Sequence, residues 1–373
     1  MAGSNANAGT SATSPKQNLS GINVNNLPAG SRLLFARGGA WTGFNVQLRN
    51  LNTTADSPMV FDAYTPGWGG TALPWLKAGG ANFAFQFGTW NDTANDGGYV
   101  IRNLRLDGLN VAGTWGVHLR NNVHHVTLEN LDISNFALGI HSGNDTSPGI
   151  TDLVIRNNNV HHNFEMGMLG DANGVLIEGN TFAYNNASGS NFDHAIYLSG
   201  HGRNAVLRNN TFTNNSAVNG VCTGGNVTIH GQWDGLLIEG NTITQAASTG
   251  SCWGFSITPG YSTAEWFRNA IVRNNTITNL GLCAICAISA PGIVISSNKI
   301  INDTSIGQIA IMISTPGDSA DAASDTPSIT GNVVCTRSPV SSSLPVMASV
   351  LGAVVSGTVY RTGADATTGA CAR

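Results

Sequence analysis

The chain has 373 residues, of which only 10% are charged and 41% are hydrophobic, so it can bury a long core, but its apolar runs are far too short to span a bilayer. The formal net charge of −4 and the lack of a basic stripe argue against nucleic acid as a partner. Only 3 lysines accompany many Asn, Thr, Ser and Gly residues, a composition that suits a secreted bacterial protein.

The N-terminal part divides into a leader and a first folded segment. Residues 1–15 are small, polar and uncharged, contain no apolar core of a signal peptide, and are expected to be a disordered leader. Residues 16–98 are interpreted as an N-terminal cap with the first repeating units. A turn containing Pro28 and Gly30 precedes the apolar run of the first strand, and residues 57–64 continue the same pattern.

Residues 99–336 repeat one short phrase, in which an Asn stands between two apolar residues, as in Ile177-Glu178-Gly179-Asn180-Thr181-Phe182. Its variable spacing predicts a solenoid whose loops absorb insertions, and its Val, Ile, Leu, Phe and Thr content predicts β-strands. Asn side chains at one place in successive coils are expected to stack and to bond one another. The reference position recurs at intervals of 22 to 34 residues, at Leu104, Leu131, Asn158, Asn180, Asn210, Asn241, Asn275, Asn298 and Asn332.

This pattern resembles the right-handed parallel β-helix of the pectate-lyase-like superfamily over roughly residues 20 to 360. The resemblance implies an all-β, single-stranded solenoid of about ten coils with an internal Asn ladder. Residues 337–373 are then expected to form a C-terminal cap or tail, since the open ends of a solenoid need covering. The same fold hosts lyases, hydrolases, epimerases, phage tailspikes and adhesins, so the function must be sought in the residues on its surface.

A second set of strands lies between the phrases and carries the candidate site. In a strand alternate residues face opposite ways, which places Val117, Ile140, Met168 and Ile196 inside the coil. Two residues before the outward column, Gly116, Gly139, Gly167 and Ala195 are expected to share its face, with Glu165 and Asp193 two positions further back. The outward residues of chemical interest are His118, Arg120, His141, Asp171, Tyr197 and His230.

Aromatic and titratable groups therefore gather on one outward sheet between residues 115 and 253. A solvated sheet face would also be polar, but it would carry Thr, Ser and Lys rather than His and Tyr, which favours a functional groove. The aromatic residues expected beside the groove to bind substrate are Trp115, Trp233 and Trp253.

The densest segment covers residues 191–203 and contains Asp193, His194, Tyr197 and Arg203. It resembles the His-Gly-Ile-Tyr strand of secreted β-helix carbohydrate proteins, with Ala195 in place of Gly. It is also loosely similar to the Asp-Pro-His segment of mannuronan epimerases, but no Pro separates Asp193 from His194. The motifs of pectate lyases and polygalacturonases are absent from the sequence.

Three functions remain open from these residues. In a lyase, Arg120, Arg203 or a His neutralises a uronate and Tyr197 or His194 removes its C5 proton, and reprotonation from the other face gives a mannuronan-type epimerase instead. In a glycoside hydrolase, Glu165, Asp171 and Asp193 supply paired carboxylates. In the third case the protein binds glycans without catalysis. We expect a polysaccharide lyase first; His141 joins its catalytic candidates, and the substrate-binding candidates are His118, Arg120, Arg203, His230, Trp115, Trp233 and Trp253.

The six cysteines predict disulfides in an exported protein, with Cys222 paired to Cys252 and Cys335 paired to Cys371. Cys283 and Cys286 have the spacing of a metal or redox motif, but no second ligand pair follows, so we interpret them as strand residues. No cofactor or metal site is expected, although calcium could bind scattered Asp and Asn side chains. The expected partner is an extracellular polysaccharide, and the expected state is a monomer.

Overall fold

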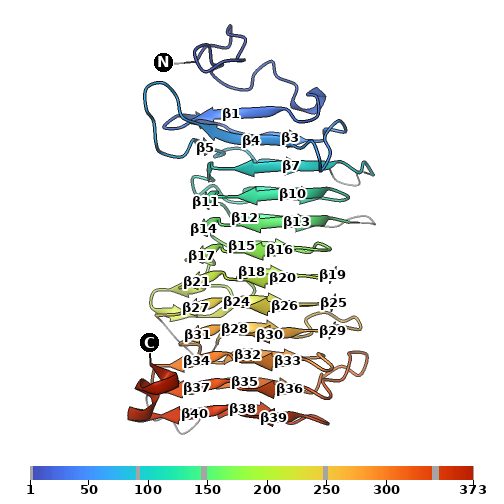
Figure 1. Ribbon diagram of the computed structural model, residues 1–373, viewed down its shortest axis with the longest axis vertical. Helices are drawn as coiled ribbons and strands as arrows, with labels where there is room; N and C mark the ends of the chain where they lie inside the picture. The colour runs from blue at the N-terminus through green and yellow to red at the C-terminus, as the bar shows by residue number, and fades with distance from the viewer. Residues whose placement is uncertain (1–2, 90–92, 144–148, 247–250, 338–343, 373) are drawn as a thin grey trace.

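The computed structural model describes residues 3–89, 93–143, 149–246, 251–337 and 344–372, and in it the chain winds into a stack of coils along one long axis (Figure 1). Three long sheets run the length of the stack, and the strands of successive coils pair in parallel within each; the last described coil contributes β39 and β40 to the first two sheets and no strand to the third. None of the helices among these residues is long and apolar enough to cross a membrane.

Sheet A contains the strand of each coil that precedes the repeated Asn. In order, its strands are β1 (Arg32–Ala36), β4 (Met59–Tyr64), β7 (Gly97–Arg102), β10 (His124–Glu129), β13 (Thr151–Arg156), β16 (Leu176–Glu178), β20 (Val206–Arg208), β26 (Leu237–Glu239), β30 (Ile271–Arg273), β33 (Val294–Ser296), β36 (Ser328–Thr330) and β39 (Val354–Ser356).

Sheet B contains the strand that follows the repeated Asn. Its strands are β2 (Ala40–Thr42), β5 (Trp75–Lys77), β8 (Arg105–Asp107), β11 (Asp132–Ser134), β14 (Asn159–His161), β17 (Thr181–Ala183), β21 (Thr211–Thr213), β27 (Thr242–Thr244), β31 (Thr276–Thr278), β34 (Lys299–Asn302), β37 (Val333–Thr336) and β40 (Val359–Thr362).

Sheet C contains the second set of strands, on which the candidate site lies. Its strands are β3 (Val46–Leu48), β6 (Phe83–Phe87), β9 (Trp115–Arg120), β12 (Leu138–Gly143), β15 (Met166–Gly170), β18 (His194–Leu198), β24 (Gly224–Ile229), β28 (Cys252–Ile257), β32 (Cys283–Ile288), β35 (Ile309–Ser314) and β38 (Leu344–Ala348).

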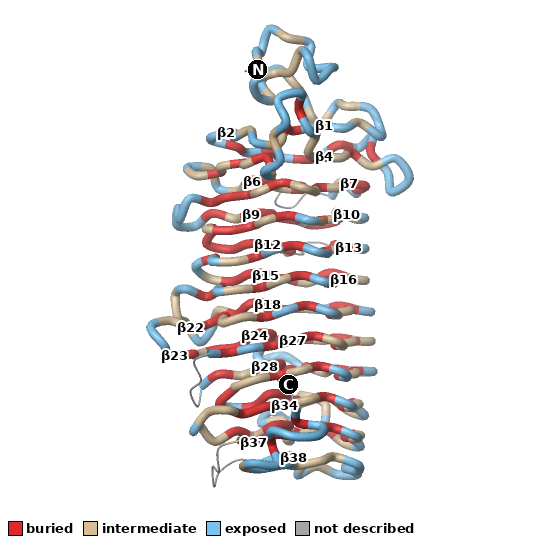
Figure 2. Tube along the Cα trace, turned by 60° about the vertical axis from the view of Figure 1, so that its left-hand side comes forward, coloured by how far each residue is buried: buried red, intermediate tan, exposed pale blue. Residues whose placement is uncertain are grey.

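Two smaller sheets and three short helices complete the described structure. A fourth sheet, sheet D, adds a short strand between sheets C and A in three successive coils: β19 (His201–Arg203), β25 (Gln232–Asp234) and β29 (Trp266–Arg268). The hairpin of β22 (Ala217–Val218) and β23 (Val221–Cys222) projects from the stack (Figure 2). The 3₁₀ helices are η1 (Val24–Asn26), η2 (Gly363–Thr367) and η3 (Gly369–Cys371).

The bend between sheets A and B depends on a left-handed residue directly before the repeated position. Asn157, Gly179 and Asn209 have φ values of 56°, 66° and 55°, and the same place has a positive φ from Asn103 to Gly331. Only Gly, and to a lesser degree Asn, adopts this conformation without large steric cost. This explains why Gly or Asn precedes the repeated Asn in every coil of the series except one, where Ser297 adopts the same conformation with a φ of 55°.

The repeated Asn side chains are buried and hydrogen-bonded from coil to coil. Asn180 Oδ1 accepts from the backbone N–H and the amide of Asn158 at 2.9 and 3.0 Å, and its own amide donates to Asn210 Oδ1 at 3.0 Å and to the carbonyl of Ile155 at 2.8 Å. The same bonds continue through Asn241, Asn275, Asn298 and Asn332. The polar bend thus has its partners inside the coil.

A second buried Asn series, which the sequence analysis did not identify, runs parallel to the first. Asn163, Asn185 and Asn215 stand at the bend between sheets B and C, where the amide of Asn163 donates to Asn185 Oδ1 at 2.9 Å and that of Asn185 to Asn215 Oδ1 at 3.0 Å. Each of them lies five residues after a member of the first series, so the same interval that identifies one series identifies both.

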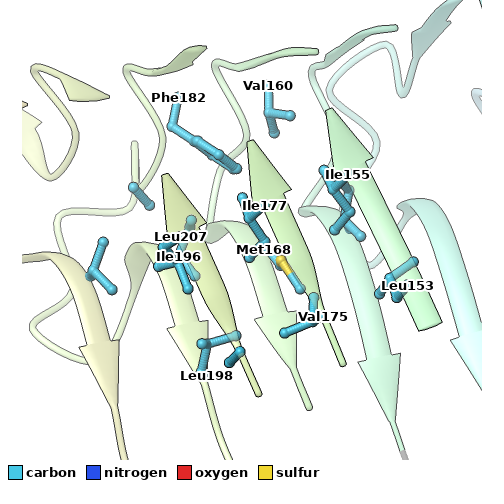
Figure 3. Close-up of a cluster of buried hydrophobic side chains, with 14 of the residues drawn as sticks. Leu153, Ile155, Val160, Met168, Val175, Ile177, Phe182, Ile196, Leu198 and Leu207 are labelled. Atoms are coloured by element: carbon cyan, nitrogen blue, oxygen red, sulfur yellow. The ribbon is translucent and has the colours of Figure 1, made fainter. Parts of the chain in front are cut away.

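The core is a continuous apolar column inside the coils. Figure 2 shows the inward residues of successive coils as buried bands, and Figure 3 shows how Ile155, Ile177 and Leu207 of sheet A meet Met168 and Ile196 of sheet C. Phe182 and Phe212 stack between adjacent coils with ring centroids 5.5 Å apart. Burial of this column provides the main driving force for folding.

Both terminal segments of the chain form short local structure. Residues 3–15, expected to be disordered, form turns in which Asn7 Nδ2 and the Ser4 N–H donate to the Pro15 carbonyl. At the other end, η2 and η3 pack beside β37 and are tied to it by the Cys335–Cys371 disulfide, which confirms that pairing.

The remaining cysteines also form disulfides. Cys222 and Cys252 are bonded, as predicted, and link the β22–β23 hairpin to β28. Cys283 and Cys286 are strand residues of β32, as expected, and their sulfur atoms are bonded to each other as well.

Candidate functional site

Two columns of side chains lie on the outward face of sheet C, and they are three residues apart along each strand instead of the two that simple alternation predicts. In register, one column runs through His118, His141, Leu169 and Tyr197. Three positions earlier, Trp115 packs on the rings of His118 and His141, so it shares the outward face. The two intervening residues of each strand both point inward, as in a β-bulge.

The glycines at the strand entrances are therefore not on the outward face, contrary to the sequence prediction. A Cβ atom at Gly139 would lie 3.0 Å from Asn163 Nδ2 and from Val160 Cγ1, and one at Gly167 would lie 2.9 Å from Phe182 Cδ1. Ala195 occupies the same column and is fully buried. Strict alternation misplaced this column because a bulge shifts the side-chain order by one residue.

The first cluster on this face contains Trp115, His118, Arg120 and His141. Arg120 Nε donates to His118 Nε2 at 3.0 Å, and the Trp115 ring stacks on the His141 ring with centroids 5.4 Å apart. Burial lowers the pKa of His118 to about 3 and that of His141 to about 4, so both imidazoles are neutral at pH 7. The cluster presents neutral rings beside one guanidinium group.

The second cluster surrounds Tyr197. The Tyr197 hydroxyl is hydrogen-bonded to the Tyr261 hydroxyl at 2.9 Å, and the His194 and His230 rings pack edge-on against Tyr197 at 5.5 and 5.3 Å. Burial and the bond to Tyr261 raise the pKa of Tyr197, and burial lowers that of His194 to about 3. At neutral pH Tyr197 is therefore an uncharged proton donor and His194 a neutral imidazole.

Tyr261 reaches the groove from a loop that a buried carboxylate holds in place. Glu265 is fully buried and accepts hydrogen bonds from the backbone N–H groups of Gly231, Gly260 and Tyr261. Its own N–H donates to Asp321 Oδ1 at 2.8 Å. The carboxylate thus fixes the loop backbone next to Tyr261, whose side chain remains 41% exposed.

A carboxylate pair lies at the entrance of β15 and β18. Glu165 directly precedes β15 and Asp193 directly precedes β18, and these two strands are neighbours in sheet C. Burial and the charge of Asp193 raise the pKa of Glu165. Burial also raises the pKa of Asp193, and this rise is opposed by a 2.7 Å hydrogen bond that Ser188 Oγ donates to its Oδ2.

Two exposed phenylalanines accompany the carboxylates. Phe164 directly precedes Glu165 and is 58% exposed, and Phe192 directly precedes Asp193 and is 83% exposed. Large apolar rings at such exposure, at the entrances of neighbouring strands, mark a contact surface, and flat rings suit the apolar faces of sugars. Each carboxylate thus directly follows an exposed aromatic residue in the chain.

Comparison with known proteins defines the fold. Residues 93–256 match the family described as "Right handed beta helix region". A rhamnogalacturonan lyase has a similar structure, with a TM-score of 0.56 at 15% identity over 95% of this chain and 85% of that chain. The protein is a right-handed parallel β-helix.

Other β-helix structures are similar to this chain. The GH136 lacto-N-biosidase from Eubacterium ramulus gives a TM-score of 0.54 at 12% identity over 97% of this chain, which spans about two thirds (67%) of that protein. A PL6 family polysaccharide lyase from Pseudopedobacter saltans gives 0.50 at 12% identity over 90% of this chain and 89% of that chain. No protein of curated function matches the chain. At these identities the similarity shows the fold.

Several residues predicted for the groove lie elsewhere in the β-helix. Trp233 is buried beneath sheet D, where its Nε1 donates to the His230 carbonyl at 3.0 Å, so it cannot stack on a substrate. Arg203 lies in β19 of sheet D, beyond the corner at Gly200. The carboxylate of Asp171 faces the same corner, within 2.7 Å of where a Cβ on Gly200 would lie. The repeat pattern of the sequence contains no signal for the extra strand of sheet D. The corner that this strand introduces accounts for the positions of all three residues.

The β-helix does place most other candidates on the outward face of sheet C or at its strand ends: Trp115, His118, Arg120, His141, His194, Tyr197, His230 and Trp253, with Glu165 and Asp193 directly before β15 and β18. The sequence analysis missed Tyr261, Glu265, Phe164 and Phe192, of which the last two could have been found as unusual aromatics beside the carboxylates. Among the described residues, no group of three or more His, Cys, Asp or Glu side chains is arranged to hold a metal ion.

Proposed function

We propose that this β-helix hydrolyses a glycosidic bond of an extracellular polysaccharide, with Glu165 and Asp193 as the catalytic pair. The observation that carries the proposal is that these two carboxylates, which directly precede the neighbouring strands β15 and β18, interact electrostatically, while burial raises the pKa of both. The solved structures that share the fold include a glycosidase and polysaccharide lyases by name. Three disulfides support an exported protein.

The two carboxylates divide the work according to their surroundings. The charge of Asp193 favours the protonated form of Glu165, which suits a general acid that gives its proton to the glycosidic oxygen. The Ser188 hydroxyl stabilises the ionised form of Asp193, which suits a nucleophile that attacks the anomeric carbon. Water then cleaves the glycosyl–enzyme ester while Glu165 takes its proton, which restores both groups.

Glu165 and Asp193 interact electrostatically at the start of two neighbouring strands. Neighbouring strands lie about 4.8 Å apart, and retaining glycosidases hold their two carboxyl groups about 5–5.5 Å apart. We therefore expect the product to keep the anomeric configuration of the substrate. Proton NMR spectra recorded in the first minutes of cleavage, before mutarotation, identify the anomer released. Release of the opposite anomer would show that the carboxylates act across a water molecule, at a larger separation than this geometry implies.

The pH dependence of kcat/KM should be bell-shaped, with both limbs at higher pH than two ordinary carboxyl groups would give. Activity requires ionised Asp193, so it falls as the pH drops through the raised pKa of Asp193. It also requires protonated Glu165, so it falls again as the pH rises through the raised pKa of Glu165. Initial rates from pH 3 to 10 test this, and a flat rate between pH 5 and 9 would exclude Glu165 as the acid.

A second candidate function, β-elimination from a uronic polymer, rests on the 2.9 Å bond between the hydroxyls of Tyr197 and Tyr261 and on the His rings packed around it. The raised pKa of Tyr197 suits protonation of the leaving oxygen. The cationic groups that would neutralise the uronate lie far from Tyr197, because Arg120 is on a strand three places away from β18 in sheet C and Arg203 lies in sheet D.

One experiment separates the two candidates. Panels of uronic and neutral polysaccharides are incubated with the protein, and absorbance near 235 nm is recorded beside a reducing-end assay. New reducing ends without absorbance support hydrolysis, whereas both signals together on a uronic polymer support elimination. Silence in both assays with every polymer would contradict the proposal and favour a glycan-binding protein.

A further inference from the structure

Sheet D forms a second surface of alternating side chains next to the groove. Gly202, Trp233 and Phe267 are its inward column: Trp233 and Phe267 are fully buried, and a Cβ at Gly202 would collide with the Trp233 ring. His201, Gln232 and Trp266 are therefore aligned on the outward side of three successive coils. Strand spacing places these three side chains about 4.8 Å apart from coil to coil.

This surface ends at a step that forms one side of an open cavity. Sheet D begins at β19, and the preceding coil runs straight from β15 to β16 through residues 171–175 without an extra strand. The cavity at this step opens to solvent and has a volume of about 600 Å³, large enough for one or two sugar rings. Its walls include Asp152, Asn173, His201, Arg203, Gln232 and Trp266.

The walls of the cavity have the chemistry of a saccharide site. Trp266 supplies a partly exposed ring, and the Arg268 guanidinium lies 4.3 Å from the ring centroid and fixes the plane of the indole. Hydrogen-bonding groups of both kinds surround it, because His201, Arg203 and Gln232 can donate while Asp152 and Asn173 can accept. Arg203 and Asp152 oppose each other in charge, which favours a neutral polyhydroxyl ligand over a polyanion.

The cavity is joined to the groove by short corners. Gly200 separates β18 from β19, and Gly231 links His230 to Gln232; both have positive φ, at 80° and 100°. A side chain at Gly231 would meet the Gly200 carbonyl, so the corner needs glycine. In the third of these coils, Tyr261 lies in the loop before β29 and Trp266 is the first residue of β29. Glu265, which lies between them in the sequence, holds the loop by accepting a hydrogen bond from the Tyr261 N–H.

We propose that the sheet D cavity is a saccharide subsite that binds neutral sugar units of the polymer cleaved in the groove, stacked on Trp266. The proposal rests on the proposed function for the identity of the polymer. A polysaccharide that occupies both sites turns the corner at Gly200 and Gly231, so the subsite contributes to the binding of long chains and leaves the bond-breaking step to sheet C.

The test uses the full chain with Glu165→Gln, so that binding is measured without turnover. Affinity electrophoresis in gels containing each polysaccharide of the panel should slow this protein with at least one of them. Trp266→Ala in the same background should weaken that binding about tenfold, the effect of losing one stacking contact. Trp68→Ala, which removes an exposed indole from the first coils, serves as the matched control and should bind unchanged.

Kinetics give an independent readout in the active protein. Trp266→Ala should raise KM for the polymer about tenfold with kcat unchanged, and it should leave cleavage of a short oligosaccharide at the rate of the unmodified chain. Equal binding and equal KM for Trp266→Ala and Trp68→Ala, or no retardation by any polymer, would overturn the subsite. Retardation that depends on Trp266 without cleavage of any polymer would keep the subsite and overturn the proposed hydrolysis.

Discussion

Replacing Glu165 by Gln should lower kcat for polysaccharide cleavage about a thousandfold while the protein stays folded. The amide keeps the volume of the carboxyl group but has no proton to give to the leaving oxygen. Glu165 is half-buried at the entrance of β15, and its pKa is raised by burial and by the charge of Asp193, so the substitution removes a repulsion rather than a stabilising pair. The unfolding midpoint should therefore stay the same or rise.

The matched control is Glu129→Gln, which removes a carboxylate on sheet A that accepts from Arg156 Nε at 2.8 Å. Because this pair lies on sheet A, outside the groove, activity should be unchanged. Asp193→Ala defines the other role: added azide should restore cleavage of an activated aryl glycoside and give a glycosyl azide of inverted configuration. Full activity in Glu165→Gln together with loss of activity in Tyr197→Phe would move the reaction to elimination.

Replacing Asn210 by Ala should lower the free energy of unfolding by about 4 kcal/mol, because each buried polar group left without a partner costs about 1–3 kcal/mol. The Asn210 side chain accepts from the N–H and the amide of Asn180, and it donates to the Ile177 carbonyl and to Asn241 Oδ1. All these groups are buried between coils, so water does not replace the lost bonds. Denaturant unfolding followed by circular dichroism measures the loss.

Asn159→Ala provides the control, because Asn159 is exposed and makes one 3.2 Å bond to Asp132. It should change the free energy of unfolding by less than about 0.5 kcal/mol. Asn210→Leu separates volume from hydrogen bonding: leucine fills the column, as Leu104 and Leu131 do, but still leaves the donors of Asn180 unpaired. If Asn210→Leu were as stable as the unmodified chain, the side-chain hydrogen bonds of Asn210 would contribute nothing to the free energy of unfolding.

The fold was predictable because each coil of a solenoid needs the same kind of residue at the same position, so the repeat is visible in the sequence. The Asn positions found by spacing make the hydrogen bonds between coils, and the strands on either side of them pair in the expected register. The inward assignment of Val117, Ile140, Met168 and Ile196 is confirmed, since all four are fully buried. Local pattern sufficed because each coil contacts mainly its neighbours.

The site was predictable only in part, for two physical reasons. A bulge in each strand of sheet C moves His194 and Trp253 onto the outward face and moves Gly139 and Gly167 inward, and alternation contains no signal for it. Tyr261 reaches Tyr197 from 64 residues away through a loop whose path depends on the buried Glu265. Contacts of that kind come from tertiary structure, which spacing alone does not encode.

The buried Asn series gives successive coils the same hydrogen-bonded contact. The side-chain hydrogen bonds that join Asn180 to Asn210, Asn210 to Asn241 and Asn241 to Asn275 all measure 3.0 Å, although the paired residues are 30, 31 and 34 positions apart in the sequence. The contact between coils therefore stays constant while the loops at the outer corners vary in length. Sheet D and the Tyr261 loop are two such longer corners. A new binding surface can evolve or be engineered here by exchanging corners alone, with the core sequence left untouched.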